Sequence, residues 1–179
     1  MSEFYTLEVA GLTRQLPICK VNDNMDIAAF IMFSDVELTV ACARDLLEKV
    51  PEFDIILTAE AKGIPLAYEM SRQSGKLYIP ARKGAKLYMS DPVIVEDVSI
   101  TTAAVQRLVI DRPDLDRMNG KRVLIVDDVI STGGSLHALE TLVERSEGII
   151  VGRAAVLAEG DASERGNIIY LATLPLFFH

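Results

Sequence analysis

Apolar residues along this chain follow two periodic patterns that alternate over most of its length. Helical spacing of apolar residues begins at Ser34 and runs toward Lys49, and it recurs over Ile64–Arg72 and from about Gly134 to Arg145. Continuous runs rich in Val, Ile and Leu are typical of strands buried on both faces, and they occupy 54–58, 77–81, 122–126 and 149–157. This alternation predicts an α/β fold with a mainly parallel central sheet flanked by helices.

The segments outside this alternation predict smaller features. Ser34-Asp-Val-Glu37 has the sequence of a capping box that opens a helix. We expect short strands at 4–9 and 15–21, a β-hairpin of 93–99 and 105–110 that turns through 100–104, and an edge strand at 168–171 before a packed apolar tail at 174–178. The whole chain, 1–179, is expected to form one domain, to which about 1–30 contribute a small hood.

Composition limits the partners that such a domain would have. The chain has 179 residues, half of them hydrophobic, and a formal net charge of −8, which argues against nucleic acid and anionic membranes as partners. We find no apolar run of membrane-spanning length and no basic N-terminal leader, so we expect a cytoplasmic location. Cys19 and Cys42 lie in apolar sequence without a nearby Cys or His, which favours reduced structural thiols.

The run from Val126 to Ser135, Val-Asp-Asp-Val-Ile-Ser-Thr-Gly-Gly-Ser, carries the clearest chemistry. It joins a buried strand to a helix, whose first N–H groups have no intrahelical partner and can hold a phosphate. Gly133 and Gly134 would let the backbone approach a ligand closely, and the neighbouring serine and threonine side chains add hydroxyl donors. Asp127 and Asp128, just upstream, could bind the hydroxyls of a phosphorylated sugar or a bound Mg²⁺.

Other interpretations fit this run less well. The aspartates could simply cap the helix, with the glycines as ordinary turn residues, but the strand, acid pair, small loop and helix together favour ligand binding. A Walker A loop is excluded because the run lacks the Gly-Lys-Ser/Thr ending, and a dinucleotide-binding turn because Gly-x-Gly-x-x-Gly does not follow the first strand.

The same run resembles the phosphoribosyl pyrophosphate motif of the type I phosphoribosyltransferases: four apolar residues, two acids, two apolar residues, then Ser/Thr-Thr-Gly-Gly-Ser/Thr. Every position fits. The resemblance implies that Asp127 and Asp128 contact the ribose hydroxyls and, directly or indirectly, Mg²⁺, and that the following loop binds the 5-phosphate. It assigns phosphoribosyl pyrophosphate to Asp127, Asp128, Val129, Ile130, Ser131, Thr132, Gly133, Gly134 and Ser135.

Two further segments gain significance from this resemblance. Glu60, Ala61, Lys62 and Gly63 lie between a strand and a helix, and in this family the corresponding loop holds pyrophosphate. In the adenine enzymes an Arg stands where Lys62 stands here, which keeps the charge but loses the bidentate fork. Without the family, Lys62 could equally be a solvated lysine beside a turn glycine.

Arg82, Lys83 and Lys86 form the second segment, a basic loop in an otherwise acidic chain. A solvated charged face is the ordinary alternative. The loop resembles the flexible catalytic loop of adenine and xanthine phosphoribosyltransferases, in which a basic residue often reaches across a dimer interface, so the resemblance implies a homodimer. We expect the loop to close over pyrophosphate and exclude water.

The base is the least determined part of the prediction. Asn24 matches in placement the hood asparagine that meets the base in xanthine enzymes. Glu159 follows the last core strand about where a 6-oxopurine enzyme would offer a lysine, and an ionised carboxylate suits the 6-amino group of adenine better. Glu159 could also be an ordinary surface acid in a turn.

The sequence therefore predicts a purine salvage transferase, with adenine favoured, that uses Mg²⁺ and displaces pyrophosphate without a protein nucleophile. Two alternatives stay open at this point: a transferase for xanthine or guanine, and a regulator that binds phosphoribosyl pyrophosphate without catalysis. His137 lies inside the helix after the motif, where a structural role fits better than that of an acid or base.

Overall fold

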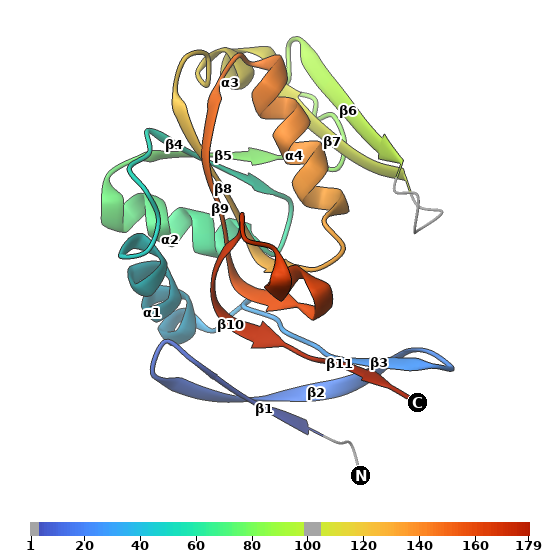
Figure 1. Cartoon of the computed structure of the whole chain (residues 1–179). Helices are drawn as coiled ribbons and strands as arrows, with labels where there is room; N and C mark the ends of the chain where they lie inside the picture. The colour runs from blue at the N-terminus through green and yellow to red at the C-terminus, as the bar shows by residue number, and fades with distance from the viewer. Residues whose placement is uncertain (1–3, 99–104) are drawn as a thin grey trace.

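The computed structural model describes residues 4–98 and 105–179, and its centre is a five-stranded parallel sheet (Figure 1). The strand order is β10-β9-β8-β4-β5. The bounds are β4 Ile55–Ala59, β5 Leu77–Ala81, β8 Arg122–Ile130, β9 Ile149–Glu159 and β10 Ile169–Leu174. Helices α1 (Val36–Leu47) and α2 (Ile64–Ser74) flank the sheet, as does α4 (Gly134–Arg145). The predicted fold class is confirmed.

Alternating side chains of the central strands build a core on each face of this sheet. On β4, Ile55 and Leu57 pack with residues of α4, whereas Ile56 packs with residues of α1 and α2. All five residues of β4 are buried, as are those of β8 from Val123 to Val126. Strands buried on both faces need no polar positions, which is why they read as continuous apolar runs in the sequence.

The start of α1 differs from the capping box that its sequence predicts. Asp35 is the N-cap, and its side chain accepts a hydrogen bond from the N–H of Leu38. Ser34 has a positive φ of 68° and precedes the cap, while the Glu37 carboxylate forms an ion pair with Arg14 at 2.8 Å. The capping-box prediction is wrong because the Arg14 side chain, from a distant strand, engages both Asp35 and Glu37.

A second sheet joins the two ends of the chain. Its order is β1-β2-β3-β11, with β1 at Phe4–Val9, β2 at Leu12–Asn22, β3 at Met25–Ala28 and β11 at Leu176–Phe178. Figure 1 shows it beside the end of the central sheet. The apolar tail is thus packed, with Phe177 edge-on to Tyr5. The segment that we expect to form a hood contributes three strands to this sheet, and we call the sheet the hood side. That the chain forms one domain with a hood stays a prediction.

The predicted hairpin and a short helix lie near the other end of the central sheet, whereas a 3₁₀ turn lies between β9 and β10 (Figure 1). Strands β6 (Pro92–Val98) and β7 (Val105–Asp111) pair antiparallel as the predicted hairpin, while the predicted turn at 100–104 lies outside the described residues. A short helix α3 (Arg112–Asp116) and a 3₁₀ turn η1 (Gly160–Glu164) were not predicted. None of the helices in the described ranges is long and apolar enough to cross a membrane.

The two cysteines differ in environment. Cys42 is fully buried within α1, as expected for a structural thiol, but Cys19 on β2 is exposed. The prediction of an apolar setting is therefore wrong for Cys19, because β2 turns alternate side chains outward and Cys19 occupies such an outward position.

Candidate active site at the ends of two adjacent strands

The acid pair lies at the carboxyl end of β8, within the strand and not after it. Strand β8 continues to Ile130, four residues beyond the predicted end, because Asp127, Val129 and Ile130 still pair with β9. Alternation along the strand leaves Asp127 partly exposed and buries Asp128 to 3% exposure. The backbone N–H of Asp128 donates to Oδ1 of Asp127 at 2.8 Å, which fixes the orientation of that carboxylate.

The loop after β8 is shaped for an anion. Gly133 has a φ of +93°, a backbone conformation that residues other than glycine rarely adopt. Helix α4 begins at the next residue. No side chain caps α4, so its first N–H groups face the loop together with the positive end of the helix dipole. The arrangement has the features expected of the predicted phosphate cradle, and the binding of phosphate there stays a prediction.

The loop at Glu60–Gly63 lies beside this cradle because β4 and β8 are neighbouring parallel strands. Thr58 pairs with Val126, so the residues that follow each of them emerge at the same edge of the sheet. The ammonium nitrogen of Lys62 lies 3.0 Å from Oδ2 of Asp128 and joins the two loops. Two segments that are far apart in sequence therefore form one site.

Gly63 permits this close approach. A Cβ atom at this position would lie 2.3 Å from Oγ1 of Thr58 and 2.9 Å from Oδ1 of Asp127, distances at which atoms would have to move. The backbone of the Glu60–Gly63 loop thus packs directly against the acid pair, and a larger residue at position 63 would separate them.

The acid pair lies in a setting that disfavours two negative charges. Burial and the neighbouring charge of Asp128 raise the pKa of Asp127 well above its usual value, and Lys62 offsets only part of this. Oγ1 of Thr58 is buried and has no hydrogen-bond partner within the described part of the chain, and the Lys62 ammonium at 3.0 Å is the charged group that faces the buried Oδ2 of Asp128. Groups like these are stabilised when a ligand supplies donors or positive charge.

The basic loop is anchored to the Glu60–Gly63 loop. The guanidinium of Arg82 contacts Oε1 of Glu60 at 3.1 Å, and the backbone N–H of Lys83 donates to Oε2 of Glu60 at 2.9 Å. Arg82 also donates to the Tyr88 hydroxyl at 2.8 Å. The Arg82 side chain and the Lys83 N–H lower the pKa of Glu60 to about 2. Arg82 is thus neutralised by Glu60, whereas no ion pair is seen for Lys83 or Lys86 among the described side chains.

A cavity of about 380 Å³ adjoins the acid pair on the hood side. The residues that follow β3 form one wall, Val129 and Ser131 another, and Lys62 and Glu159 supply its charged groups. Burial raises the pKa of Glu159, with Lys62 acting in the opposite direction. The complete lining is Ile27, Ala28, Ala29, Phe30, Ile31, Lys62, Val129, Ser131, Glu159 and Leu174. A flat, mostly apolar ligand with polar edges would suit this cavity.

Asn24 is not part of this cavity. It lies exposed in the turn between β2 and β3, where its N–H donates to the Asn22 side chain and its carbonyl accepts from the N–H of His179. The sequence match of Asn24 to a hood asparagine therefore does not bring it into the lining of this cavity or of the neighbouring one described below.

Sequence reasoning missed the residues that approach the motif from elsewhere in the chain. A second cavity, of about 530 Å³, shares Ile27, Ser131 and Glu159 with the first and is also lined by Thr132 and Arg165. Nη2 of Arg165 donates to the carbonyl of Thr132 at 2.8 Å. Nothing in the local sequence around Arg165 marks it, because its position depends on how η1 packs beside the motif.

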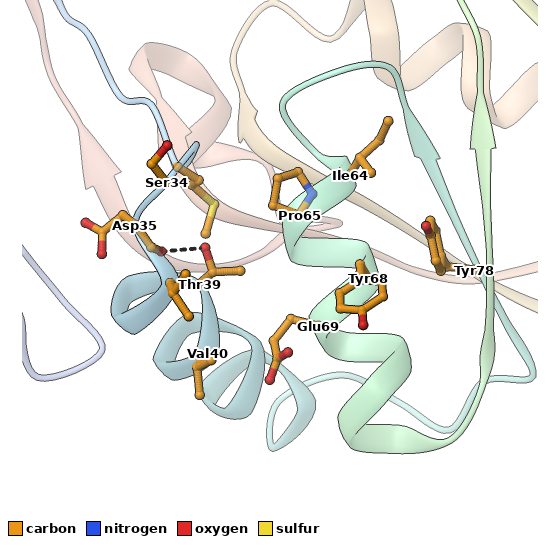
Figure 2. A pocket seen from close by; sticks show the side chains of 11 residues that line it. Ser34, Asp35, Thr39, Val40, Ile64, Pro65, Tyr68, Glu69 and Tyr78 are labelled. Carbon is orange, nitrogen blue, oxygen red and sulfur yellow. Dashed lines mark hydrogen bonds between the residues drawn. The ribbon is translucent and has the colours of Figure 1, made fainter.

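A third cavity lies away from these residues, between α1 and α2 (Figure 2). It has a volume of about 340 Å³, and no residue of the motif or of the Glu60–Gly63 loop lines it. Figure 2 shows Pro65 and Tyr68 on α2 opposite Thr39 and Val40 on α1. Its lining is largely apolar and carries none of the phosphate-binding features, so we place the active site at the motif.

The phosphoribosyl transferase domain family matches residues 41–170, which include both loops and the basic segment. The chain belongs to this family. The resemblance predicted from the motif is thereby confirmed. Curated relatives include the adenine phosphoribosyltransferase of Thermotoga petrophila, 36% identical over 103 residues, which are 58% of this chain and 58% of that protein. The enzyme of the same name from Rhodococcus jostii is 32% identical over 126 residues, covering 70% of this chain and 69% of the relative.

Solved structures agree with this assignment. The phosphoribosyltransferase fold of this chain is similar to adenine phosphoribosyltransferase from Thermoanaerobacter pseudethanolicus, with a TM-score of 0.66, 26% identity and coverage of 79% of this chain and 84% of that one. The enzyme from Rhodothermus marinus has a TM-score of 0.64 over 96% of this chain and 94% of its own, and at 20% identity it supports the fold alone.

Proposed function

We propose that this protein is an adenine phosphoribosyltransferase, which converts adenine and phosphoribosyl pyrophosphate to AMP and pyrophosphate. The observation that carries the proposal is the Lys62–Asp128 contact of 3.0 Å, which joins a phosphate cradle and a second anion-binding loop at one sheet edge. Both loops border the 380 Å³ cavity through Lys62 and Ser131. A ligand with a phosphate, a sugar and a pyrophosphate would span these features in order.

The substrate groups are assigned by chemistry. The 5-phosphate binds at the loop Ser131–Ser135, at the start of α4, where backbone N–H groups without an intrahelical partner favour an anion. The ribose hydroxyls would donate to the carboxylates of Asp127 and Asp128, whose oxygens can each accept more than one hydrogen bond. Pyrophosphate binds at the Glu60–Gly63 loop beside the Lys62 ammonium. The base occupies the cavity that Glu159 lines.

The reaction is a displacement at the anomeric carbon of the sugar. A ring nitrogen of the base forms the new bond to that carbon, while the bond to pyrophosphate breaks and its electron pair leaves with the pyrophosphate. The proton that this nitrogen carried is released to solvent or to the pyrophosphate. The transition state is oxocarbenium-like, so positive charge develops on the sugar and negative charge on the leaving group. Asp127 and Asp128 lie on the sugar side of this charge separation, and Lys62 lies on the pyrophosphate side.

The basic loop is assigned to the leaving group. Glu60 holds the base of this loop through Arg82 and the Lys83 N–H, which leaves the side chains of Lys83 and Lys86 to approach pyrophosphate. Closure of the loop would exclude water from the reacting sugar, which prevents hydrolysis of the activated substrate. Arg82 then acts mainly as the anchor of the loop.

Mg²⁺ fits this site as an ion shared with the substrate. Oδ2 of Asp128 is a buried hard oxygen whose charged neighbour, the half-exposed Lys62, can move aside, and Asp127 is adjacent to it. Within the described ranges no group of three or more His, Cys, Asp or Glu side chains could hold a metal. Substrate oxygens would therefore complete the coordination, and the bound ion would neutralise charge on the pyrophosphate.

Adenine is preferred over 6-oxopurines on two grounds. Glu159 offers acceptor oxygens to a 6-amino group, whereas a 6-oxo group would face a carboxylate that cannot donate when ionised. The relatives and structures with which the chain aligns are named adenine phosphoribosyltransferases. Transfer to xanthine or guanine, and binding of phosphoribosyl pyrophosphate without catalysis, are not favoured by these similarities.

The homodimer and the cytoplasmic location belong to the same proposal. The loop that follows Arg82 carries exposed apolar side chains, with Tyr88 at 68% exposure, which a second subunit could cover. The mass of the protein in solution, measured by light scattering, tests the dimer: a monomer at working concentration would contradict it.

The experiment for the activity is pyrophosphate release with Mg²⁺, phosphoribosyl pyrophosphate and one base at a time: adenine, guanine, hypoxanthine, xanthine or orotate. Turnover with adenine is expected, together with its loss in the Asp127→Asn/Asp128→Asn variant and its retention in the exposed Asp23→Asn control. Turnover of another base would correct the substrate, and calorimetric binding of phosphoribosyl pyrophosphate without turnover of any base would support a regulator.

A further inference from the structure

Arg165 brings a guanidinium group from outside the motif directly onto the phosphate loop. It follows η1 and precedes β10, more than 30 residues after Thr132, whose carbonyl accepts a hydrogen bond from Nη2 at 2.8 Å. A Cβ atom at Gly133 would lie 2.6 Å from Nη1 of Arg165, so the guanidinium packs against the glycine that opens α4. It thus occupies the space that a side chain at position 133 would fill.

This guanidinium differs from most others in the described part of the chain because it has no ion-pair partner there. Among the described side chains, every other arginine except Arg145 forms an ion pair with an aspartate or glutamate, although the chain carries a net charge of −8. Arg165 has no carboxylate at ion-pair distance in that set. Its Nη2 donates to the Thr132 carbonyl, and Arg165 lines the 530 Å³ cavity, whose polar lining also includes Ser131, Thr132, Glu159 and Asp161.

A cation is what the motif itself lacks. The run from Ser131 to Ser135 contains hydroxyl and glycine residues but no Lys or Arg. Its attraction for a phosphate therefore rests on N–H groups and the helix dipole, which supply only partial charges. A phosphate monoester carries nearly two negative charges at neutral pH, and a planar guanidinium is well suited to bind two of its oxygens.

We propose that Arg165 is a positioning residue for the 5-phosphate of the substrate and supplies the positive charge of that subsite. The inference rests on the proposed function, since it assigns a further residue to the same site. It gives the C-terminal segment a part in the site: Glu159 ends β9 directly before η1 and Arg165 follows η1, so the two ends of one short turn border the base cavity and the phosphate loop.

A purely structural role would have a different signature. If Arg165 only ties η1 to the loop through the Thr132 carbonyl, its loss would lower stability and weaken phosphorylated and unphosphorylated ligands alike. If Arg165 binds the phosphate, its loss would lower the affinity only for ligands that carry the phosphate. The ratio of affinities for AMP and adenosine therefore separates the two roles, and it does not depend on catalysis.

The test uses the full chain and three variants: Arg165→Gln, Arg165→Lys and, as a matched control, Arg145→Gln. Arg145 ends α4, has no carboxylate partner among the described residues and donates to the carbonyl of Ile94, so its replacement removes the same charge far from the phosphate loop. Binding of AMP, adenosine and ribose 5-phosphate is measured by calorimetry, with thermal unfolding of each variant recorded without ligand.

We expect Arg165→Gln to weaken AMP and ribose 5-phosphate about 10- to 100-fold, the range for a lost charge-assisted hydrogen bond, with adenosine binding unchanged. Arg165→Lys should lie between this variant and the wild type, and Arg145→Gln should match the wild type. If Arg165→Gln does not fold, the affinities of Arg165→Lys for AMP and adenosine still test the proposal.

Two results would overturn the inference: unchanged AMP affinity in Arg165→Gln, or equal losses for AMP and adenosine. Either result, combined with wild-type turnover of adenine, leaves the proposed function intact and removes only the role of Arg165. A wild-type protein that neither turns over a base nor binds AMP or ribose 5-phosphate would instead contradict the proposed function, and the inference with it.

Discussion

The ammonium nitrogen of Lys62 lies 3.0 Å from Oδ2 of Asp128, and this contact holds the loop after β4 against the end of β8. Asp128 is almost completely buried, and the Lys62 ammonium is the positive charge next to its Oδ2. Lys62 is half exposed and can turn toward a ligand. It is thus placed to exchange a contact with the carboxylate for a contact with pyrophosphate.

Replacement of Lys62 by Gln should raise the KM for phosphoribosyl pyrophosphate by about 10-fold or more, because the pyrophosphate loop loses its charge and a buried carboxylate loses its cation. Lys62→Arg should keep much of the activity. Lys49→Gln, a change at an exposed lysine on the surface, is the control and should have no effect. Steady-state kinetics with varied phosphoribosyl pyrophosphate measures this, and an unchanged KM in Lys62→Gln would contradict it.

Gly63→Ala should damage both the fold and the site. The added Cβ would meet Oγ1 of Thr58 and Oδ1 of Asp127, so the loop and the acid pair must move apart. We expect a loss of about 1–3 kcal/mol in the free energy of unfolding and a strong loss of substrate binding. Gly166→Ala is the matched control, since no atom lies within 4 Å of its added Cβ. Denaturant unfolding of the two variants should separate them clearly.

Base selectivity should respond to the charge at position 159. Glu159→Lys replaces acceptors by a donor next to the base, so turnover of hypoxanthine relative to adenine should rise by about 10-fold or more. Asp161→Lys makes the same change of charge at an exposed position of the neighbouring cavity and should leave the ratio unchanged. Competition between the two bases measures the ratio. An equal shift in both variants would mean that net charge, and not contact with the base, decides it.

The contact between Glu60 and Arg82 should make stability depend on pH. The pKa of Glu60 falls from 4.5 to about 2, so its stabilising effect is fully present above 4.5 and is lost as the pH falls toward 2. Wild type should therefore be more stable than Glu60→Gln near neutral pH, and the gap should close in acid. Thermal unfolding of both proteins across this range measures the gap, with the exposed Glu8→Gln as control. A gap that is constant with pH would show that Glu60 is not held by this ion pair.

Thiol labelling should distinguish the two cysteines. Cys19 is exposed, whereas Cys42 is buried and its burial raises the pKa of the thiol to about 12. A thiol reagent at neutral pH should therefore modify one cysteine quickly and the second only after unfolding. Labelling of Cys19→Ser under native conditions provides the check: rapid reaction of its remaining thiol would mean that α1 opens readily.

Local sequence was sufficient for the fold class because the central strands and helices carry their own periodicity. Strand β5 and helix α4 have the predicted bounds, and β4 and β9 differ from them by one or two residues. Strand β8 was predicted too short, since its last residues include two aspartates that do not resemble a buried strand. Their place in the strand follows from pairing with β9, a tertiary contact.

In the candidate site, too, some features follow from local sequence and others from tertiary contacts. The acid pair and the phosphate loop are contiguous in sequence, so residue order alone determined their chemistry and the helix that follows them. The Lys62–Asp128 contact, the approach of Arg165 to Gly133 and the placement of Asn24 outside the cavities depend on which strands are neighbours and how the hood packs. Only the tertiary structure decided these three placements, because contacts between distant segments depend on how the whole chain packs. No periodic pattern in the sequence marks the residues that make such contacts.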